Sequence, residues 1–305
     1  MSETVAPILQ ALLDGVMIGG VYAVLSVGLS LVFGVMGIVN FAHAEFLMVG
    51  MFVAYFAWAY LGLDPMIGAF VALALVFVVG MGLQRVLIRP ILGAPEVAQI
   101  FLTVGLLFAM ENGALLLFGA DYRSVVTPYQ TDALLVWSAA PAAEIVDATP
   151  RILVGVDKLL AFAMALLLGT AVWVFMRHTR TGRAMRATAQ DLMAAKLMGI
   201  DTDRMHQIAF GLGVGATAFG GAVVLPYISA SPTIGTQFVV LMFTAVVLGG
   251  LGSVAGAVVG GLLVGIIQSL STLVLPIQLQ NLVLFVVFIL VLAFRPEGIV
   301  ARRRS

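Results

Sequence analysis

The chain has 305 residues, of which 62% are hydrophobic and only 10% are charged, and its formal net charge is zero. A soluble domain carries about 25% charged residues, so this composition excludes an ordinary soluble protein and predicts a chain that lies in lipid along its whole length. The chain contains no cysteine, which excludes disulfides, thiolate metal sites and cysteine nucleophiles. No basic stripe outside the loops that flank the membrane indicates a nucleic-acid partner.

The apolar segments predict an all-α, polytopic membrane protein with about eight or nine transmembrane helices, some of them short or broken. A helix needs roughly 20 apolar residues to cross the hydrocarbon core of a bilayer. No linker interrupts the apolar segments, so a single transmembrane domain over 1–305 is expected. Candidate spans lie near 8–34, 46–62, 66–84, 98–118, 158–176, 207–228, 236–250, 254–274 and 277–294.

The basic residues set the expected orientation, because short loops rich in Lys and Arg stay in the cytoplasm. One group comprises Arg85 and Arg89, a second lies in 177–206, and the third is the tail from Arg295 to Arg304. If these groups share a side, that side holds twelve of the fifteen Lys and Arg residues and faces the bacterial cytoplasm. This arrangement predicts a multi-pass inner-membrane protein with a cytoplasmic C-terminus and an external N-terminus.

Two polar segments stand apart from the spans. Residues 119–157 form the expected external loop, with five acidic residues and three prolines, and they either cap the protein or dock an external partner. Residues 177–206 form the expected cytoplasmic loop, and their richness in Ala, Met, Arg and Gln predicts a helix. Thr181 is expected to cap the start of that helix and Gly199 to end it. The helix is either a solvated connector or, since small residues lie among its charges, a surface on which another protein packs.

Motifs of enzymes are absent from the sequence. There is no H-E-x-x-H and no G-x-S-x-G, and no metal-ligand spacing links His43, His178 and His206. We therefore expect no catalytic residues and no metal or cofactor bound by this chain. Neither Lys158 nor Lys196 follows a glycine, which excludes a Walker A phosphate-binding loop. If ATP drives a process here, another chain must bind the ATP.

Polar residues occur between the first two spans, in G-I-V-N-F-A-H-A-E-F at 37–46. Asn40, His43 and Glu45 lie within six residues of one another, and such groups are costly at membrane depth. Three interpretations are open: a short loop at the membrane surface, a hydrogen-bonding network where a helix breaks, or contact with a substrate.

A second set of polar residues lies inside spans. Glu111 and Asn112 fall within 98–118, and a carboxylate there costs about 2.5 to 3.5 kcal/mol if it faces lipid. Glu111 is therefore expected to face the interior of the bundle or a water-filled path, and Asn112 is a candidate for the same path. Asp14 and Gln268 are similar, weaker cases, and any of the four could form only a packed hydrogen bond.

The segment 248–261 is rich in glycine. It opens a run of G-x-x-x-G pairs that predict close helix packing in lipid, namely Gly256 with Gly260 and Gly261 with Gly265. Glycine also suits a broken helix, and broken helices line binding sites in transporters. The candidate break consists of Gly249, Gly250, Gly252 and Ser253. Further breaks or helix ends are predicted at Pro226, Pro232 and Pro276.

Taken together, five motifs resemble the membrane permease subunits of bacterial branched-chain amino-acid ABC transporters, of the LivH-like type. They extend from residue 37 to residue 299, which is nearly the whole chain. One departure is Ala44, where the family usually has Gly. The motifs are G-I-V-N-F-A-H-A-E-F at 37–46, T-G-R-A-M-R-A-T-A-Q-D at 181–191, A-A-K-L-M-G-I at 194–200, A-V-V-L-G-G-L-G-S-V-A-G at 245–256 and R-P-E-G-I at 295–299.

The resemblance implies a permease subunit that forms half of the translocation path for branched-chain or related amino acids in an ATP-driven importer. It implies three kinds of partner: a second homologous permease, two cytoplasmic ATPase subunits that use the ATP, and a periplasmic substrate-binding protein. It also implies that the stretch from 181 to 199 is the coupling helix, in which A-A-K-L-M-G keeps the A-A-x-x-x-G spacing of the family's EAA loop and Met193 replaces its leading Glu. The coupling residues carried over by this match are Thr181, Gly182, Arg183, Arg186, Asp191, Ala194, Ala195 and Gly199.

Other functions remain open at this point. A secondary transporter would use Glu45 or Glu111 as its proton-linked group, and a membrane scaffold would transport nothing. Relatives in the family also take amides or urea. The match of the coupling loop favours the importer, in which bulky residues at Gly182 or Ala195 are expected to uncouple ATP hydrolysis from uptake.

Overall fold

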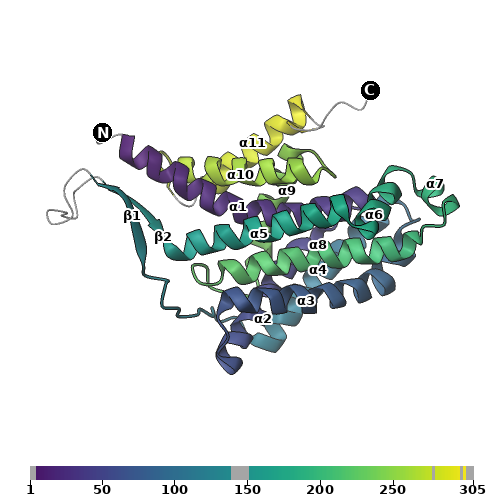
Figure 1. The fold of residues 1–305 in the computed structure, drawn as a ribbon, viewed down its shortest axis with the longest axis horizontal. Helices are drawn as coiled ribbons and strands as arrows, with labels where there is room; N and C mark the ends of the chain where they lie inside the picture. Colours follow the sequence, from purple (N-terminus) through teal and green to yellow (C-terminus); the bar gives the residue numbers. More distant parts are fainter. Residues whose placement is uncertain (1–4, 139–150, 277–278, 296–297, 300–305) are drawn as a thin grey trace.

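The computed structural model of the chain describes residues 5–138, 151–276, 279–295 and 298–299 (Figure 1). Most of its helices lie roughly along one long axis, and the two ends of the molecule differ. At one end, here the α6–α7 end, two helices project from the bundle, α6 (Arg180–Gln190) and α7 (Leu192–Leu197). At the other, the hairpin end, two strands project, β1 (Ala133–Ser138) and β2 (Arg151–Gly155).

Seven helical segments in the described part of the chain are long and apolar enough to cross a membrane. Two more apolar helices are shorter, with 16 and 15 residues. Each expected span corresponds to one of these nine segments, which confirms an all-α polytopic membrane protein, although 277–278 of the last expected span lie outside the described residues. The long segments are α1 (Val5–Met36), the 3-10 turn η1 (Phe41–Ala44) continued by α2 (Glu45–Leu61), α3 (Pro65–Leu83) extended through the turns η2 (Gln84–Ile88) and η3 (Arg89–Ile91), α4 (Glu96–Phe118), α5 (Val156–His178), α8 (Thr202–Val224) and α10 (Val254–Ser271), and the short ones are α9 (Ile234–Gly249) and α11 (Gln280–Phe294).

Helix α1 is the longest element, with 32 residues. At a rise of 1.5 Å per residue it measures about 48 Å, whereas the hydrocarbon core of a bilayer is about 30 Å thick. The helix must therefore tilt or extend beyond the hydrocarbon. It ends at Gly37, whose φ of 69° lies in the left-handed region that favours glycine, and whose N–H donates to the Phe33 carbonyl.

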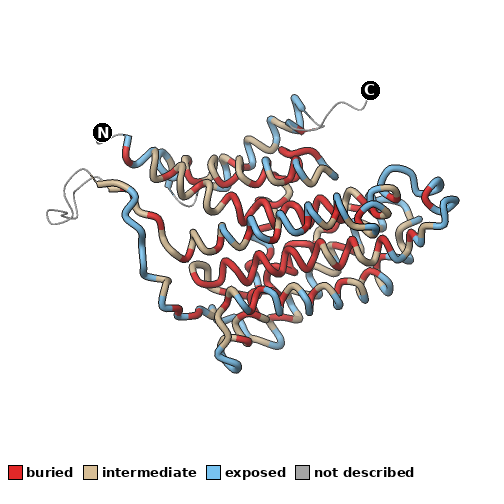
Figure 2. Tube along the Cα trace, in the orientation of Figure 1, coloured by how far each residue is buried: buried red, intermediate tan, exposed pale blue. Residues whose placement is uncertain are grey.

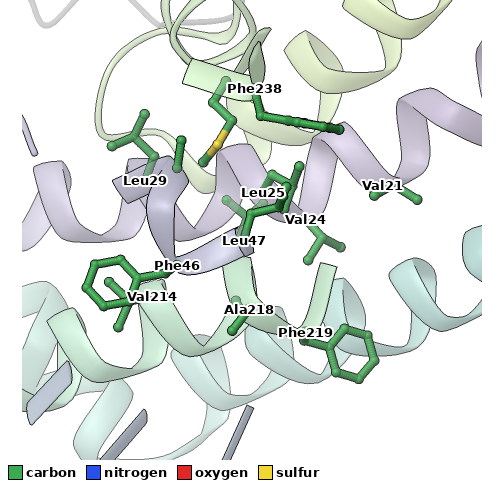
Figure 3. Packing of buried hydrophobic residues seen from close by; sticks show 14 of the residues in the cluster. Val21, Val24, Leu25, Leu29, Phe46, Leu47, Val214, Ala218, Phe219 and Phe238 are labelled. Atoms are coloured by element: carbon green, nitrogen blue, oxygen red, sulfur yellow. The ribbon is translucent and has the colours of Figure 1, made fainter. Parts of the chain in front are cut away.

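The core lies where α1 and α8 pack together, and burial falls toward the outer helices (Figure 2). Leu25 of α1, Leu47 of α2 and Phe219 of α8 are fully buried, and Figure 3 shows them among side chains from the same helices and from α9. Most residues of α4 and α5 are exposed or half-buried rather than buried. Those exposed apolar surfaces face lipid or another chain, because water would not accept them.

The glycine pairs of α10 let its backbone come into direct contact with the backbones of two neighbouring helices. Gly260 faces α9, since a Cβ added there would lie 1.9 Å from the Ala245 carbonyl oxygen. Gly261 faces α1, since a Cβ there would lie 2.3 Å from the Ala23 nitrogen. The packing interpretation of the G-x-x-x-G pairs is thus confirmed.

We expect Gly260→Ala to destabilise the protein by about 1–3 kcal/mol, because the added methyl group has no room and the α9 backbone must move. Gly105→Ala is the matched control, since a Cβ at this position in α4 meets nothing within 4 Å. That control should be neutral or slightly stabilising, because Ala favours helix more than Gly does. Thermal unfolding of both purified variants in detergent measures the difference. Equal midpoints would contradict the packing assigned to α10.

The predicted break at 249–253 is a turn between two antiparallel helices and not an interruption within one span. Gly249 packs on Gly256, and the next pair along is Ala245 with Gly260, so α9 and α10 run in opposite directions. Two residues of the turn, Gly250 and Gly252, have positive φ. Ser253 accepts a hydrogen bond from the Gly256 N–H at 3.0 Å and caps α10. The predicted helix ends are confirmed, because Pro226 and Pro232 lie between α8 and α9, and Pro276 follows α10.

The segment expected to be an external loop, 119–157, contains an antiparallel pair of strands. Ala133 pairs with Gly155, and the register shifts at a bulge between Leu135 and Trp137. The pair is tied to α1 by the Gln10 side-chain amide, which donates to the Leu153 carbonyl and accepts from the Leu153 N–H, at 2.7 and 2.8 Å. Residues 139–150, which hold two of the three prolines and two of the five acidic residues, lie outside the described residues.

The first part of that segment is held onto the bundle. The backbone of Arg123 pairs with that of Ala230, in the segment between α8 and α9. The Tyr129 hydroxyl donates to Asp64 at 3.0 Å, where the chain turns from α2 to α3. Burial and the bond to this carboxylate raise the pKa of the Tyr129 phenol above its usual value, so the phenol stays protonated and donates. These contacts support the interpretation as a cap, and docking of an external partner stays a prediction.

Candidate functional site

The chain turns back into the bundle after α1, and η1 lies against the interior helices. Residues 37–40 are irregular, and the Asn40 side-chain oxygen accepts a hydrogen bond from the Ala42 N–H at 3.1 Å, which caps η1. Asn40 is fully buried. Irregular backbone at membrane depth is tolerated only where protein or a water-filled cavity surrounds it, and here η1 contacts α2, α4, α8 and α9. This geometry excludes the surface-loop interpretation of 37–46.

His43 joins η1 to the middle of α8. Its Nε2 lies 2.8 Å from the Thr217 hydroxyl, and that hydroxyl also donates to the Gly213 carbonyl at 3.1 Å. Since the hydroxyl has one proton, Nε2 then carries the ring proton and donates to Thr217. Nδ1 is left as a buried acceptor with no partner among the described residues. Thr217 was not predicted as a site residue, because it lies 174 positions away in a run of small apolar residues.

Glu45 is the first residue of α2, and its side chain is fully buried against the first turn of α9. A Cβ added to Gly235 would lie 2.4 Å from Oε1, so a glycine there is what leaves room for the carboxylate. Neither carboxylate oxygen has a hydrogen-bond partner among the described residues. The partial positive charge of a helix N-terminus favours a carboxylate at this place, but burying an unpaired ion remains costly. Gly235 was also not predicted, since nothing in the sequence brings α9 to Glu45.

The two polar residues of α4 behave differently from each other. The carboxylate of Glu111 is half-buried and close enough to Glu45 for the two to repel each other. Asn112 is exposed and donates to the Phe108 carbonyl of its own helix at 2.8 Å. Glu111 and Asn112 therefore point in different directions, because one helical position turns a side chain by about 100°. Glu45 and Glu111 form one acidic region.

The two weaker candidates have partners within the chain. Asp14 forms an ion pair with Lys158 at 2.9 Å and accepts from Gln10 at 2.8 Å, near the hairpin end. Gln268 accepts from the Tyr22 hydroxyl at 2.7 Å and links α10 to α1. For both, the interpretation as a packed hydrogen bond is confirmed.

The glycine turn lies far from the acidic region. Gly235 and Gly249 are the two ends of α9, and 14 residues of helix separate them by about 21 Å. A Cβ on Gly34, near the end of α1, would lie 3.0 Å from the Gly252 carbonyl oxygen. Gly249, Gly250, Gly252 and Ser253 thus lie at the α6–α7 end, and the structure does not bring them together with Asn40, His43 and Glu45.

The predicted coupling loop folds as two helices. The Thr179 hydroxyl accepts a hydrogen bond from the Gly182 N–H at 2.9 Å and caps α6, so the expectation that Thr181 caps the helix is wrong by two residues. Asp191 ends α6 and caps α7 by accepting from the N–H groups of Met193 and Ala194, at 2.9 Å each. Gly199, with φ of 78°, ends α7 as predicted.

Two of the predicted coupling residues face inward. A Cβ on Gly182 would lie 2.3 Å from the Phe175 carbonyl oxygen, so this glycine packs α6 onto the end of α5. Ala195 is 3% exposed. Bulky residues at these two positions would therefore disturb the packing of the chain itself. Among the other predicted coupling residues, Arg183, Arg186, Asp191, Ala194 and Gly199 are exposed and Thr181 is half-buried.

The outer surface of α7 is apolar. Leu197 and Met198 are 82% and 81% exposed, and Met193 is 68% exposed. Together with Leu192 they form what we call the α7 apolar surface, which projects from the α6–α7 end (Figure 1). Apolar groups that reach beyond a bundle typically mark a protein interface. The signal in the sequence is the large apolar residues in an otherwise polar loop.

Comparison with known proteins gives matches over nearly the full length of the chain. The family described as "Branched-chain amino acid transport system / permease component" matches residues 11–292. The high-affinity branched-chain amino acid transport system permease protein LivH of Escherichia coli K12 is 32% identical over 311 residues, which cover 99% of this chain and 98% of the relative. Its counterpart BraD of Pseudomonas aeruginosa is 32% identical over 303 residues, 96% of each chain. The ribose import permease RbsC of E. coli matches 32% of this chain at 33% identity. No solved structure matches.

Proposed function

This chain belongs to the family of branched-chain amino acid transport permeases, and we propose that it forms half of the translocation path of an ATP-driven importer for branched-chain or related amino acids. The observation that carries this proposal is the α7 apolar surface. An ATP-driven permease without a phosphate-binding loop needs a separate ATPase, and that ATPase needs a surface to bind outside the lipid. Leu197 and Met198 offer it beside a basic helix.

The orientation follows from the charges at the two ends. Arg85, Arg89 and the arginines of α6 lie at the α6–α7 end, and Lys158 lies near the hairpin end. The excess of Lys and Arg supports a cytoplasmic α6–α7 end in the inner membrane. The C-terminus is then cytoplasmic and the N-terminus external. Two ATPase subunits bind at the α6–α7 end, a periplasmic binding protein delivers substrate at the hairpin end, and a second homologous permease completes the path.

Within the membrane, we assign the acidic region of Glu45 and Glu111 to the translocation path. An amino acid carries an ammonium group, and a buried carboxylate without a partner is suited to bind it. Asn40 and His43 hold η1, and with it Glu45, in place through their bonds to Ala42 and Thr217. The ATP is used by the partner subunits.

A second candidate function is favoured by the same carboxylate. Glu45 without a partner also suits a proton-linked secondary transporter, in which the carboxyl group takes up and releases a proton during each cycle. The α7 apolar surface would then have no ATPase to bind. Within the importer, amides and urea remain alternative substrates.

Reconstitution separates these functions. We expect the complete assembly that co-purifies with this chain to take up radiolabelled leucine into vesicles only when ATP is loaded inside and the binding protein is present outside. A non-hydrolysable ATP analogue is the control. Uptake that follows a pH gradient without ATP would show that the protein is a secondary transporter and not an importer driven by ATP. A folded assembly that transports no leucine would show that the protein is a membrane scaffold. Competition by amides or urea in the same assay reports the substrate class.

A further inference from the structure

Two adjoining cavities form one groove along α1, α5 and α10. The cavity nearer the α6–α7 end has a volume of about 420 Å³, and its neighbour has about 350 Å³. Both are lined by Trp173 of α5 and Val254 of α10, which shows that the cavities meet. The groove runs along α5 from Phe162 to Arg177.

The inner part of the groove is apolar and matches one membrane leaflet in depth. Its lining is Gly, Ala, Val, Leu and aromatic side chains, with Thr170 as the one polar residue. From Phe162 to Trp173 the helix rises by about 16 Å, and half of a hydrocarbon core is about 15 Å. Gly169 lies in this part, and a Cβ there would meet nothing within 4 Å. The space has the length and the polarity of one acyl chain.

The outer part of the groove is basic. Arg177 of α5 and Arg186 of α6 both line it, and no acidic residue lines either cavity. Neither arginine has an ion-pair partner among the described residues, although the Arg177 guanidinium lies over the Trp173 ring, 5.1 Å from its centre. Tryptophan prefers the boundary between hydrocarbon and headgroups, which places Arg177 at the depth of the phosphates.

We propose that this groove binds an anionic phospholipid from the leaflet at the α6–α7 end. The acyl chain lies between α1, α5 and α10, and the phosphate lies between Arg177 and Arg186. Two guanidinium groups without an ion-pair partner among the described residues, above an apolar channel, complement a phosphate with a hydrocarbon tail, whereas acidic residues are rare in a transmembrane helix of a partner. The two arginines belong to different helices, so the bound lipid would link α6 to α5 at the base of the α7 apolar surface.

Native mass spectrometry of the purified full-length chain, with any subunits that co-purify, tests the headgroup. Phosphatidylglycerol and phosphatidylcholine with the same acyl chains are titrated separately. We expect phosphatidylglycerol to bind more tightly, and the double variant Arg177→Gln/Arg186→Gln to weaken its binding about thirtyfold, from about fivefold for each arginine. The matched control is Arg180→Gln/Arg183→Gln, which removes the same charge from arginines that do not line the groove.

Filling the apolar part tests the acyl chain. Gly169→Phe should displace the lipid, whereas Gly105→Phe, on the open face of α4, should leave binding unchanged. Equal binding of the two phospholipids, or an equal loss in both arginine double variants, would overturn the proposal. Unchanged binding in Gly169→Phe would reduce the site to a phosphate site without an acyl chain, and a crosslink from position 169 to another protein chain would show that a helix fills the groove. The binding readout does not depend on transport, so it can fail while the proposed function stands.

Discussion

Leu197→Glu is expected to release the ATPase subunit from the permease. Leu197 is 82% exposed on α7, so it contributes nothing to the core of this chain, and its replacement leaves the fold intact. In an assembled importer the same side chain would be buried against the ATPase. An apolar residue at the centre of an interface contributes about 2 kcal/mol or more to the binding free energy, and burying an unpaired carboxylate in its place costs further binding free energy. We therefore expect association to weaken by at least about thirtyfold. The ATPase retained by the affinity-tagged permease after washing measures this loss.

Val126→Glu is the matched control for that experiment. Val126 is 76% exposed and lies in the segment that covers the hairpin end, so an exposed aliphatic side chain is again replaced by a carboxylate, at the opposite end of the molecule. It should leave ATPase retention unchanged. Since the chain has no cysteine, a single cysteine at position 198 also reports sidedness. A membrane-impermeant maleimide should reach it only in opened cells, and labelling of intact cells would remove the coupling assignment.

The spans could be predicted because the length of each apolar segment can be counted directly in the sequence. The start of the second span shows what could not. Its first turn is η1, which lies inside the bundle because Asn40 caps it locally and His43 reaches Thr217 on α8. The local part of this arrangement has a sequence signal, the polar residues at 40, 43 and 45. The partners on α8 and α9 are chosen by packing between segments far apart in the chain.

The coupling loop shows the same division between local and distant causes. Its helical character, its end at Gly199 and its place beside the membrane were predictable from composition and from glycine. Thr179 and Thr181 are equally able to cap a helix, and the choice of Thr179 accompanies the packing of Gly182 on the end of α5. The presence of a glycine in the sequence does not identify the segment of the chain that packs against it. For that reason Gly182 could be assigned to an outer surface although it lies inside.

Glu45→Gln is expected to lower uptake by about ten- to a hundredfold while the protein folds normally. The amide has the shape of the carboxyl group, so the space that Gly235 leaves is filled in the same way. It lacks the negative charge, and a bond to a charged group contributes about 1.5–3 kcal/mol. A residue retained for stability would give the opposite pattern. Because neither oxygen of Glu45 has a partner among the described residues, removing its charge should leave the thermal midpoint unchanged or raise it.

Two comparisons make this prediction specific. Glu96→Gln removes the same charge from an exposed position at the start of α4 and should leave uptake unchanged. Gly235→Ala keeps the carboxylate but displaces it, since the new Cβ would lie 2.4 Å from Oε1. It should lower both uptake and the thermal midpoint, which distinguishes a misplaced carboxylate from an absent one.

The double variant Gly235→Ala/Glu45→Gln decides whether the two residues act as one unit. If Gly235 matters only by giving Glu45 its position, the alanine should reduce uptake little further once the charge is gone, and the two effects should not add. Additive losses would mean that α9 and Glu45 contribute separately, and Glu45 would no longer be the group that the start of α9 holds for the substrate. Uptake by Glu45→Gln at the unsubstituted rate would remove the carboxylate from the translocation path altogether. Transport would then depend on the shape of the path near η1 rather than on its charge.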